Sequence, residues 1–520
     1  MRTFFKVMSV VMMVALIFGV VGANVALAQS AKDASWVVSV TYQNVGTEAA
    51  TITVNFYAEG SATAIPFNPL QGIGDGTLAA GAGASFYIGS VSGISDGWRG
   101  SAVMSADQPL VATVVQFSQD AGFKMRLLSN GFQSGDASEQ YLVATVLLNK
   151  FGRTTVFSVQ NTENSAIDAT INFYDADNNG ALASTITHEI PAQSSKYIDM
   201  SNSADTGLSS SLTSFNGSAI ITAEFVSGGA ANVVAAASEY YTTRPVAANF
   251  EGVPLSKAAT TVYLATGLCE RYGLDTYYAV QNASLTPGED AFIEVTYRDT
   301  NGNTVATDGR YEIGPGQKKS IVTCSPSDST DMSNFTGSAV INSYNAATGT
   351  TAGAPIVAIG KAQTSANAGT STTADAFTAF LGEPAGVSKI AVPFIRWASD
   401  ANFIASNPGK QRTYIAIQNL GSSTVKVNVT YKDRNGSTVG STQTLTIAGY
   451  AKANSDPASA GVLNVSTDMN TDEFGYYKDG GYGAGAIIEA HPDNPTATFI
   501  AIVRANNQGA SEDYNGPGAE

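Results

Sequence analysis

The chain has 520 residues and a formal net charge of −16, from 27 basic and 43 acidic residues. This excess of acid excludes nucleic acid and anionic lipid head groups as partners, because both are bound through clusters of Lys and Arg. Glycine contributes 51 residues and charged residues only 13%, a composition that favours short strands and tight turns over helices, and the length calls for several cores.

Residues 1–28 predict a secretory signal peptide. Two basic residues precede an uncharged apolar run over 7–21, and Ala-Leu-Ala at 26–28 supplies the small residues that a signal peptidase recognises. We expect cleavage before Gln29 and an extracellular or cell-surface location. An uncleaved membrane anchor is the alternative. No later apolar run reaches 18 residues, so we expect no membrane insertion after the signal is cleaved.

Four copies of one unit follow the signal, with predicted boundaries at 29–138, 139–255, 256–385 and 386–520. The first marker of each copy is an apolar segment that ends in Gln-Asn, at Gln43-Asn44, Gln160-Asn161, Gln281-Asn282 and Gln418-Asn419. The second is an alternating segment that ends in an aromatic residue, at Phe56, Phe173, Tyr297 and Tyr431. The third is an aromatic residue followed by x-Gly-Ser-Ala, starting at Trp98, Phe215 and Phe335, with a drifted version at Tyr482.

These markers have the pattern of a β-sandwich. Ile52, Val54 and Phe56 alternate with polar residues, which places one row in a core and the other in water. Asn- and Gly-rich hairpin turns follow the aromatic residue of the second marker in the later copies. The sequence therefore predicts an all-β chain of four tandem immunoglobulin-like β-sandwich domains of about seven strands each.

The first copy lacks one expected element. An apolar opening strand is expected at 141–148, 262–268 and 390–395 in the later copies, but only a short polar segment, 29–35, precedes Trp36. A strand-poor terminal cap would explain the difference. Alternatively, a strand of a neighbouring molecule fills the gap and links protomers.

Three predicted linkers, near 119–139, 242–260 and 364–388, join the copies. Each contains an aromatic residue beside glycine, namely Phe132, Phe250 and Phe380. A flexible tether needs no such aromatic residue. We expect these segments to pack against a neighbouring domain and to stiffen a rod.

In combination, the markers resemble the tandem repeats of large exported proteins of envelope-forming bacteria. The second copy carries the resemblance most clearly, at 154–161, 174–180 and 215–219, and the likeness covers nearly all of 35–508. It implies an immunoglobulin-like fold, a structural role at the cell surface and no catalytic residue. The fourth copy departs from the pattern through an insertion around 465–482.

Few residues are candidates for chemistry. His188 and His491 are the only histidines and neither recurs between copies, so we predict no enzyme. Asp175, Asp177 and Asn178 offer hard oxygen ligands for structural calcium, although an ordinary hairpin turn explains the same residues. No other cofactor is expected.

Cys269 and Cys324 both lie in the third copy. In an oxidising exterior we expect a disulfide between them, closing a loop of about 55 residues, with two buried free thiols as the alternative.

Repetition favours a secreted or cell-surface protein with a structural or adhesive role, such as a component of a surface layer, sheath or filament. We expect such a protein to associate with itself or with other surface proteins. The alternative is an extracellular array of carbohydrate-binding modules that binds cell-wall or environmental glycan. Such modules need exposed aromatic rings, and the cluster to test for that role is Tyr476, Tyr477 and Tyr482.

Overall fold

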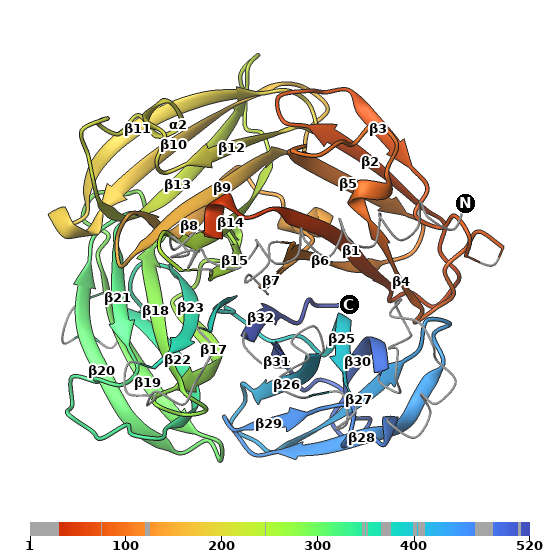
Figure 1. Ribbon diagram of the computed structural model, residues 1–520. Coiled ribbons are helices and arrows are strands. Elements are labelled where there is room, and N and C mark those ends of the chain that lie inside the picture. Colours follow the sequence, from red (N-terminus) through yellow and green to blue (C-terminus); the bar gives the residue numbers. More distant parts are fainter. Residues whose placement is uncertain are drawn as a thin grey trace, which may run out of the picture.

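A computed structural model describes residues 31–73, 75–119, 125–244, 246–345, 349, 352–365, 376–398, 403, 411–462, 482–507 and 511–519. The described chain is all-β, as predicted, and its strands form antiparallel sheets that pack as sandwiches. Four such groups follow one another around a common centre (Figure 1). The predicted signal peptide lies outside the described residues.

The first repeat contributes two sheets with the strand orders β4-β1-β6-β7 and β3-β2-β5, and a core that includes Tyr42, Val54 and Phe56 lies between them. The strands are β1 (Trp36–Asn44), β2 (Ile52–Ala58), β3 (Ala64–Phe67), β4 (Gly83–Tyr87), β5 (Gly100–Ala106), β6 (Leu110–Ser118) and β7 (Arg126–Asn130). Three 3₁₀ turns accompany them: η1 (Ala31–Asp33), η2 (Ile88–Ser90) and η3 (Ser134–Asp136).

The second repeat forms the sheets β11-β10-β13-β8-β16 and β12-β9-β14-β15. Its strands are β8 (Gln140–Leu148), β9 (Arg153–Asn161), β10 (Ile167–Asp175), β11 (Ala181–Ile190), β12 (Ser195–Asp199), β13 (Phe215–Phe225), β14 (Val233–Tyr241), β15 (Ala247–Glu251) and β16 (Val253–Pro254). The short turns η4 (Ala176–Asn178), α2 (Ser203–Thr206) and η5 (Leu255–Lys257) complete it.

The third repeat forms the sheets β17-β22-β19-β20 and β21-β18-β23-β24. Its strands are β17 (Thr261–Leu268), β18 (Leu274–Asn282), β19 (Ala291–Asp299), β20 (Thr304–Ile313), β21 (Lys318–Val322), β22 (Thr336–Tyr344), β23 (Ile356–Thr364) and β24 (Phe377–Leu381).

In the fourth repeat the two sheets are joined at one pair, Trp397 with Arg412, into the order β28-β27-β30-β25-β26-β31-β32, and β29 pairs with β26. The strands are β25 (Lys389–Trp397), β26 (Gln411–Asn419), β27 (Val425–Lys432), β28 (Thr438–Ile447), β29 (Lys452–Ser455), β30 (Tyr482–Ala490), β31 (Phe499–Asn507) and β32 (Ser511–Asn515).

The repeats share one strand order. From the second repeat on, the opening strand (β8, β17, β25) pairs with the strand that carries the Gly-Ser-Ala marker (β13, β22, β30). The strand that ends in Gln-Asn (β9, β18, β26) pairs with β14, β23 and β31, respectively. This order differs from the ABED and CFG sheets of antibody domains, although the sandwich architecture is the same.

The sequence markers are explained by contacts inside each sandwich. The aromatic residues of the second and third markers pack against each other in every repeat, as Phe56–Trp98, Phe173–Phe215, Tyr297–Phe335 and Tyr431–Tyr482, with ring centroids 6.0–6.5 Å apart. The asparagine of the first marker ties down a turn: Asn161 Nδ2 donates to the carbonyls of Ser165 at 2.8 Å and Pro191 at 3.0 Å. Gly217 is required because a Cβ there would lie 2.1 Å from the carbonyl oxygen of Tyr174.

The four repeats close into a ring, so the expectation of a rod is wrong (Figure 1). The first and fourth repeats meet through an apolar cluster of Val45, Val111, Ala391, Ile487 and Ala519. Gln133 Nε2 also donates to the carbonyl of Gly518 at 2.8 Å. The last repeat therefore packs against the first and leaves no free end to the array.

The ring closes because a strand from each predicted linker and the last strand of the chain's described part meet at its centre. We call β7, β15, β24 and β32 the hub. Asn130 Nδ2 on β7 donates to the carbonyl of Asn515 on β32 at 2.8 Å, and Asn515 Oδ1 accepts from the amide of Leu381 on β24 at 2.7 Å. Phe250 on β15 and Phe380 on β24 are buried, as expected of segments that pack against neighbours. These segments form the contact at the centre of the ring and do not act as stiff linkers between domains in a row.

Candidate functional site: an open strand edge

The first repeat has an unpaired strand edge that the other repeats lack. β13, β22 and β30 are each paired on both sides, on one side by an opening strand. β5 pairs with β2 alone, and no described strand covers its other edge. No residue of β5 is buried, whereas seven of the nine residues of β30 are. The unpaired main chain of β5 is therefore available to another strand.

A groove of about 1710 Å³ runs along this edge, between the first and second repeats. Its walls come from β1, β5 and β6 on one side and from β9, β12 and β14 on the other. Its lining includes Val38, Ala102, Met104, Val114, Val234 and Ala236. We call it the opening-strand groove, because it lies at the position that β8, β17 and β25 occupy in their own repeats.

Three polar groups on the wall of this groove have no partner among the described residues. They are the Ser195 hydroxyl and the indole nitrogens of Trp36 and Trp98. Ser195 is only 1% exposed, so its hydroxyl has lost water without gaining a hydrogen bond. Such a group costs about 1–3 kcal/mol and is uncommon in a complete core.

The equivalent positions at the other boundaries show what Ser195 lacks. Ser195, Lys318 and Lys452 are each the first residue of the strand that faces the preceding repeat. Lys318 Nζ donates to Thr145 Oγ1 at 3.3 Å, and Lys452 Nζ donates to the carbonyl of Ala265 at 3.3 Å. Thr145 and Ala265 lie on opening strands, β8 and β17. The first repeat has no described opening strand with which Ser195 could bond.

The boundary between the second and third repeats is sealed by buried charge. Glu239 is fully buried and forms ion pairs with Lys361 at 2.5 Å and Arg153 at 2.7 Å. Burial by itself would raise the pKa of Glu239, but the two cations hold it below its usual value. Burial lowers the pKa of Lys361 to about 8, against the opposing attraction of Glu239. Thr145 Oγ1 completes the group by accepting from Lys361 at 3.2 Å.

The hub holds a second group of buried acids. Burial raises the pKa of Glu251 to about 7, and the nearby carboxylates of Glu383 and Asp136 act in the same direction. The amide of Asn130 donates to Glu251 and limits the rise. Burial also raises the pKa of Glu383, which accepts from Asn515 Nδ2 at 2.6 Å. These side chains link neighbouring hub strands.

The proposed calcium ligands are engaged with the protein. Asp177 forms an ion pair with Lys150 at 2.6 Å through one carboxylate oxygen and accepts from Asn216 Nδ2 at 2.8 Å through the other. Asp175 caps the turn by accepting from the amide of Asp177, and Asn178 ends η4. These contacts are those of a turn between β10 and β11, and calcium binding at these three residues stays a prediction.

Cys269 and Cys324 form a disulfide in the structure, with Cα atoms 5.1 Å apart. Within the described residues, the sole group of three potential metal ligands consists of these cysteines and Asp275. Both sulfurs are used in the disulfide, so this group serves as a covalent link between the end of β17 and the segment after β21 and not as a metal site.

The predicted aromatic cluster does not form a described surface. Tyr482 is 1% exposed, and its hydroxyl donates to the carbonyl of Lys432 at 2.6 Å, so the prediction that it contacts a ligand is wrong. Its place in the core follows from its role as the aromatic residue of the third marker. Tyr476 and Tyr477 lie outside the described residues.

The two histidines are far apart and contact turns. His188 Nε2 lies 2.9 Å from the carbonyl oxygen of Asp205, and His491 Nδ1 lies 3.4 Å from Asp493. Neither stands beside a serine in a nucleophile–base arrangement in the part of the chain that the structure describes.

Sequence reasoning missed two exposed aromatic residues. Phe151 and Tyr272 lie in the turns that join β8 to β9 and β17 to β18, where the chain passes from one sheet to the other, and they are 58% and 70% exposed. Both have positive φ angles, 54° and 57°, which are rare for aromatic residues. Each is followed by glycine, and the recurrence of aromatic-Gly at the same place in two repeats was the signal that could have found them.

Across the described residues, no helix is long and apolar enough to cross a membrane. A comparison with known protein-family models and with curated proteins finds no match for this chain.

Proposed function

We propose that the protein is an exported, non-catalytic structural component of the cell surface that joins a neighbouring surface protein by β-strand addition. The observation that carries this proposal is the unpaired edge of β5 beside the opening-strand groove. An unpaired edge lends its main-chain groups to an incoming strand, and the groove offers pockets for that strand's side chains.

The opening strands of the other three repeats indicate what kind of segment could add to β5. β8, β17 and β25 are buried along almost their whole length, because one face covers the sandwich core and the other faces the next repeat. The occupant must therefore be a single extended segment of about eight residues that is apolar at nearly every position. A whole domain does not fit between two repeats.

The partner is another surface protein in this proposal. In the described residues of this chain, the apolar strands are already paired within their own sheets, so a second copy has none of them to donate. The partner would supply an apolar terminal segment that enters the groove as an added strand.

In-cell photo-crosslinking tests the proposal. A photoreactive amino acid in place of Met104, on the open strand β5, should give an adduct between this chain and one envelope protein on washed cells. The same substitution at Val226, exposed at the far end of β13, is the matched control and should give no adduct. Absence of an adduct at Met104, an adduct with a second copy of this chain, or recovery of the protein from cytosol would each overturn the proposal.

Glycan binding is a second candidate, favoured by the exposed rings of Phe151 and Tyr272. Exposed aromatic rings on turns between strands can stack on sugar rings. Cations lie beside both rings, Lys150 at 5.5 Å from the centroid of Phe151 and Arg271 at 4.8 Å from that of Tyr272. A glycan array with the wild type and with a Phe151→Ala, Tyr272→Ala double variant decides this candidate, since binding by both proteins or by neither would reject it.

A further inference from the structure

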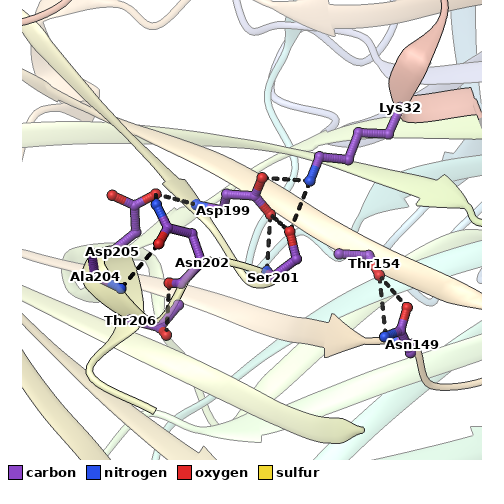
Figure 2. A network of polar contacts seen from close by, with 9 residues as sticks. All are labelled: Lys32, Asn149, Thr154, Asp199, Ser201, Asn202, Ala204, Asp205 and Thr206. Atoms are coloured by element: carbon purple, nitrogen blue, oxygen red, sulfur yellow. Dashed lines mark hydrogen bonds and ion pairs between the residues drawn. The ribbon is translucent and has the colours of Figure 1, made fainter. Parts of the chain in front are cut away.

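The turn that carries Phe151 is fixed by hydrogen bonds on both sides of the aromatic residue. The amide of Asn149 donates to Thr154 Oγ1 at 3.1 Å, and the same hydroxyl donates to Asn149 Oδ1 at 3.3 Å (Figure 2). After the aromatic residue, the carbonyl of Gly152 accepts from the amide of Thr242 at 2.8 Å. The backbone that presents Phe151 to solvent is therefore held in one place.

The turn that carries Tyr272 repeats these bonds in the next repeat. The amide of Glu270 donates to Asp275 Oδ1 at 2.7 Å, and the carbonyl of Gly273 accepts from the amide of Ser365 at 2.9 Å. Aromatic residues at positive φ are strained, and strain of this kind is found at binding sites. The same strained and exposed ring in two repeats indicates a role in binding, because the fold itself gains little from a ring in water.

Cations lie around Phe151 in particular. Lys150 Nζ is 5.5 Å from the ring centroid, and the guanidinium carbon of Arg153 is 5.9 Å from it. Lys150 donates to Asp177 Oδ2 at 2.6 Å, but its ammonium group has three hydrogens and its side chain is 31% exposed. Lys150 can therefore donate to a ligand as well as to Asp177.

Basic groups outnumber acidic ones at the repeat boundary next to this turn. Ion pairs and electrostatic contacts join the acids Asp177 and Glu239 to four basic residues: Lys150, Arg153, Lys318 and Lys361. The chain as a whole carries a net charge of −16, so this positive group contrasts with an acidic molecule. A local excess of positive charge attracts an anionic ligand to this turn and not to the rest of the surface.

We infer that the Phe151 turn binds a glycan whose sugar rings bear carboxylates, with the Tyr272 turn as a second contact along the same glycan chain. The apolar face of a sugar ring would stack on Phe151, and a carboxylate at the edge of that sugar would accept from Lys150. The two turns occupy equivalent places in neighbouring repeats of the ring, so one extended polymer can meet both (Figure 1).

This inference rests on the proposed function in its second form, glycan binding by exposed rings, and adds the charge of the glycan. An acidic peptide would meet the same cations. Peptide side chains, however, are recognised in pockets, whereas a flat ring on a turn matches the flat apolar face of a sugar. The geometry therefore favours a glycan over a peptide.

Titration with linear polygalacturonate and with its methyl ester tests the inference. The two polymers have the same sugar rings and linkages, but the ester has no charge. With EDTA present, so that no divalent cation bridges two anions, the protein should bind polygalacturonate in a saturable way. The methyl ester, and polyglutamate as a polyanion without sugar rings, should each bind at least about tenfold more weakly. No saturable binding of polygalacturonate, or equal binding of either control polymer, would overturn the inference.

Single substitutions locate the binding. Phe151→Ala should weaken the binding of polygalacturonate at least about fivefold, and Lys150→Gln about threefold. Tyr87→Ala, which removes a ring that is 47% exposed in the first repeat, is the matched control and should leave binding unchanged. If Tyr87→Ala weakens binding as much as Phe151→Ala does, the polymer binds elsewhere and the inference fails. Tyr272→Ala should weaken binding about threefold, and an unchanged affinity would reject the second contact.

The polymer titrations and the glycan array fail separately. An array on which only neutral glycans bind, in a way that needs Phe151 and Tyr272, would keep glycan binding and reject the carboxylate. Polygalacturonate that binds the Phe151→Ala variant as tightly as the wild type would reject this turn as its site, whatever the array shows. Neither result affects the adduct expected at Met104.

Discussion

The boundary between the second and third repeats and the boundary between the first and second repeats use equivalent surfaces, yet one is sealed and the other is open. At the sealed boundary β8 lies between the repeats, and Thr145 accepts hydrogen bonds from Lys318 and Lys361. At the open boundary no described strand takes that place, and Ser195 is buried without a partner. The comparison shows that the opening strand belongs to two repeats at once, since it completes one sandwich and covers the next.

The two boundaries also differ in how they use charge. The sealed boundary tolerates Glu239 because two cations neutralise it in the absence of water. The open boundary is held by contacts beside the groove, such as Tyr197 donating to the carbonyl of Gly100 at 2.9 Å and Ser101 donating to that of Gln193 at 3.1 Å. Those contacts join the two repeats directly, without a described strand between them.

The largest effect is expected from Glu239→Gln at the sealed boundary. The substitution leaves Lys361 and Arg153 buried without a counter-charge, which should cost about 3–5 kcal/mol in the free energy of unfolding. Urea unfolding at pH 7 measures the loss. Asp493→Asn, which breaks the surface pair with Lys426, is the control and should leave the midpoint unchanged. Equal midpoints for the Glu239 variant and the wild type would show that the buried group does not seal the boundary.

The hub should respond to pH through Glu251. Its pKa is raised from 4.5 to about 7 in the folded chain, so its contribution to stability is complete below pH 4.5 and is lost as the pH rises through 7. Glu251→Gln keeps the acceptor for Asn130 and removes the charge. The variant should be more stable than the wild type at pH 8 by about 3 kcal/mol and equal to it near pH 4. Parallel stability–pH curves for the two proteins would contradict this assignment.

Two hydroxyl groups, Thr145 at the sealed boundary and Ser195 at the open one, sharpen the comparison directly. Thr145→Val at the sealed boundary removes the acceptor that Lys318 and Lys361 share and should cost about 1–3 kcal/mol. Ser195→Ala at the open boundary removes a buried hydroxyl that has no partner among the described residues and should raise the free energy of unfolding by about 1–3 kcal/mol. Thermal melts of the two variants and the wild type measure both changes. A loss for Ser195→Ala as large as that for Thr145→Val would show that the open boundary is already complete.

The smallest effect on stability is expected in the turns that carry Phe151 and Tyr272. Phe151→Ala and Tyr272→Ala remove rings that are mostly in water, so each should change the free energy of unfolding by less than about 0.5 kcal/mol. Calorimetry provides the measurement, and a larger loss would mean that the rings stabilise the fold instead of meeting a partner.

The repeat markers determined the local structure of each sandwich because they are contacts within one repeat. The aromatic residues of the second and third markers must pack together, and the marker asparagine must satisfy the carbonyls of a turn, wherever the repeat lies in the chain. By the same rule Tyr482, the aromatic residue of the third marker in the fourth repeat, packs against Tyr431 in the core. The insertion around 465–482 hides this rule in the sequence, because it places other tyrosines close to Tyr482.

The sequence by itself determined the strands of each repeat, their alternation and the cysteine pair. Only the tertiary structure decided that four repeats close into a ring and that three of the four hub strands come from segments expected to be linkers. Closure depends on the angle between successive repeats and on contacts such as that of Asn130 with Asn515, which are 385 residues apart. No local pattern encodes such an angle, because it is set by how two finished surfaces pack.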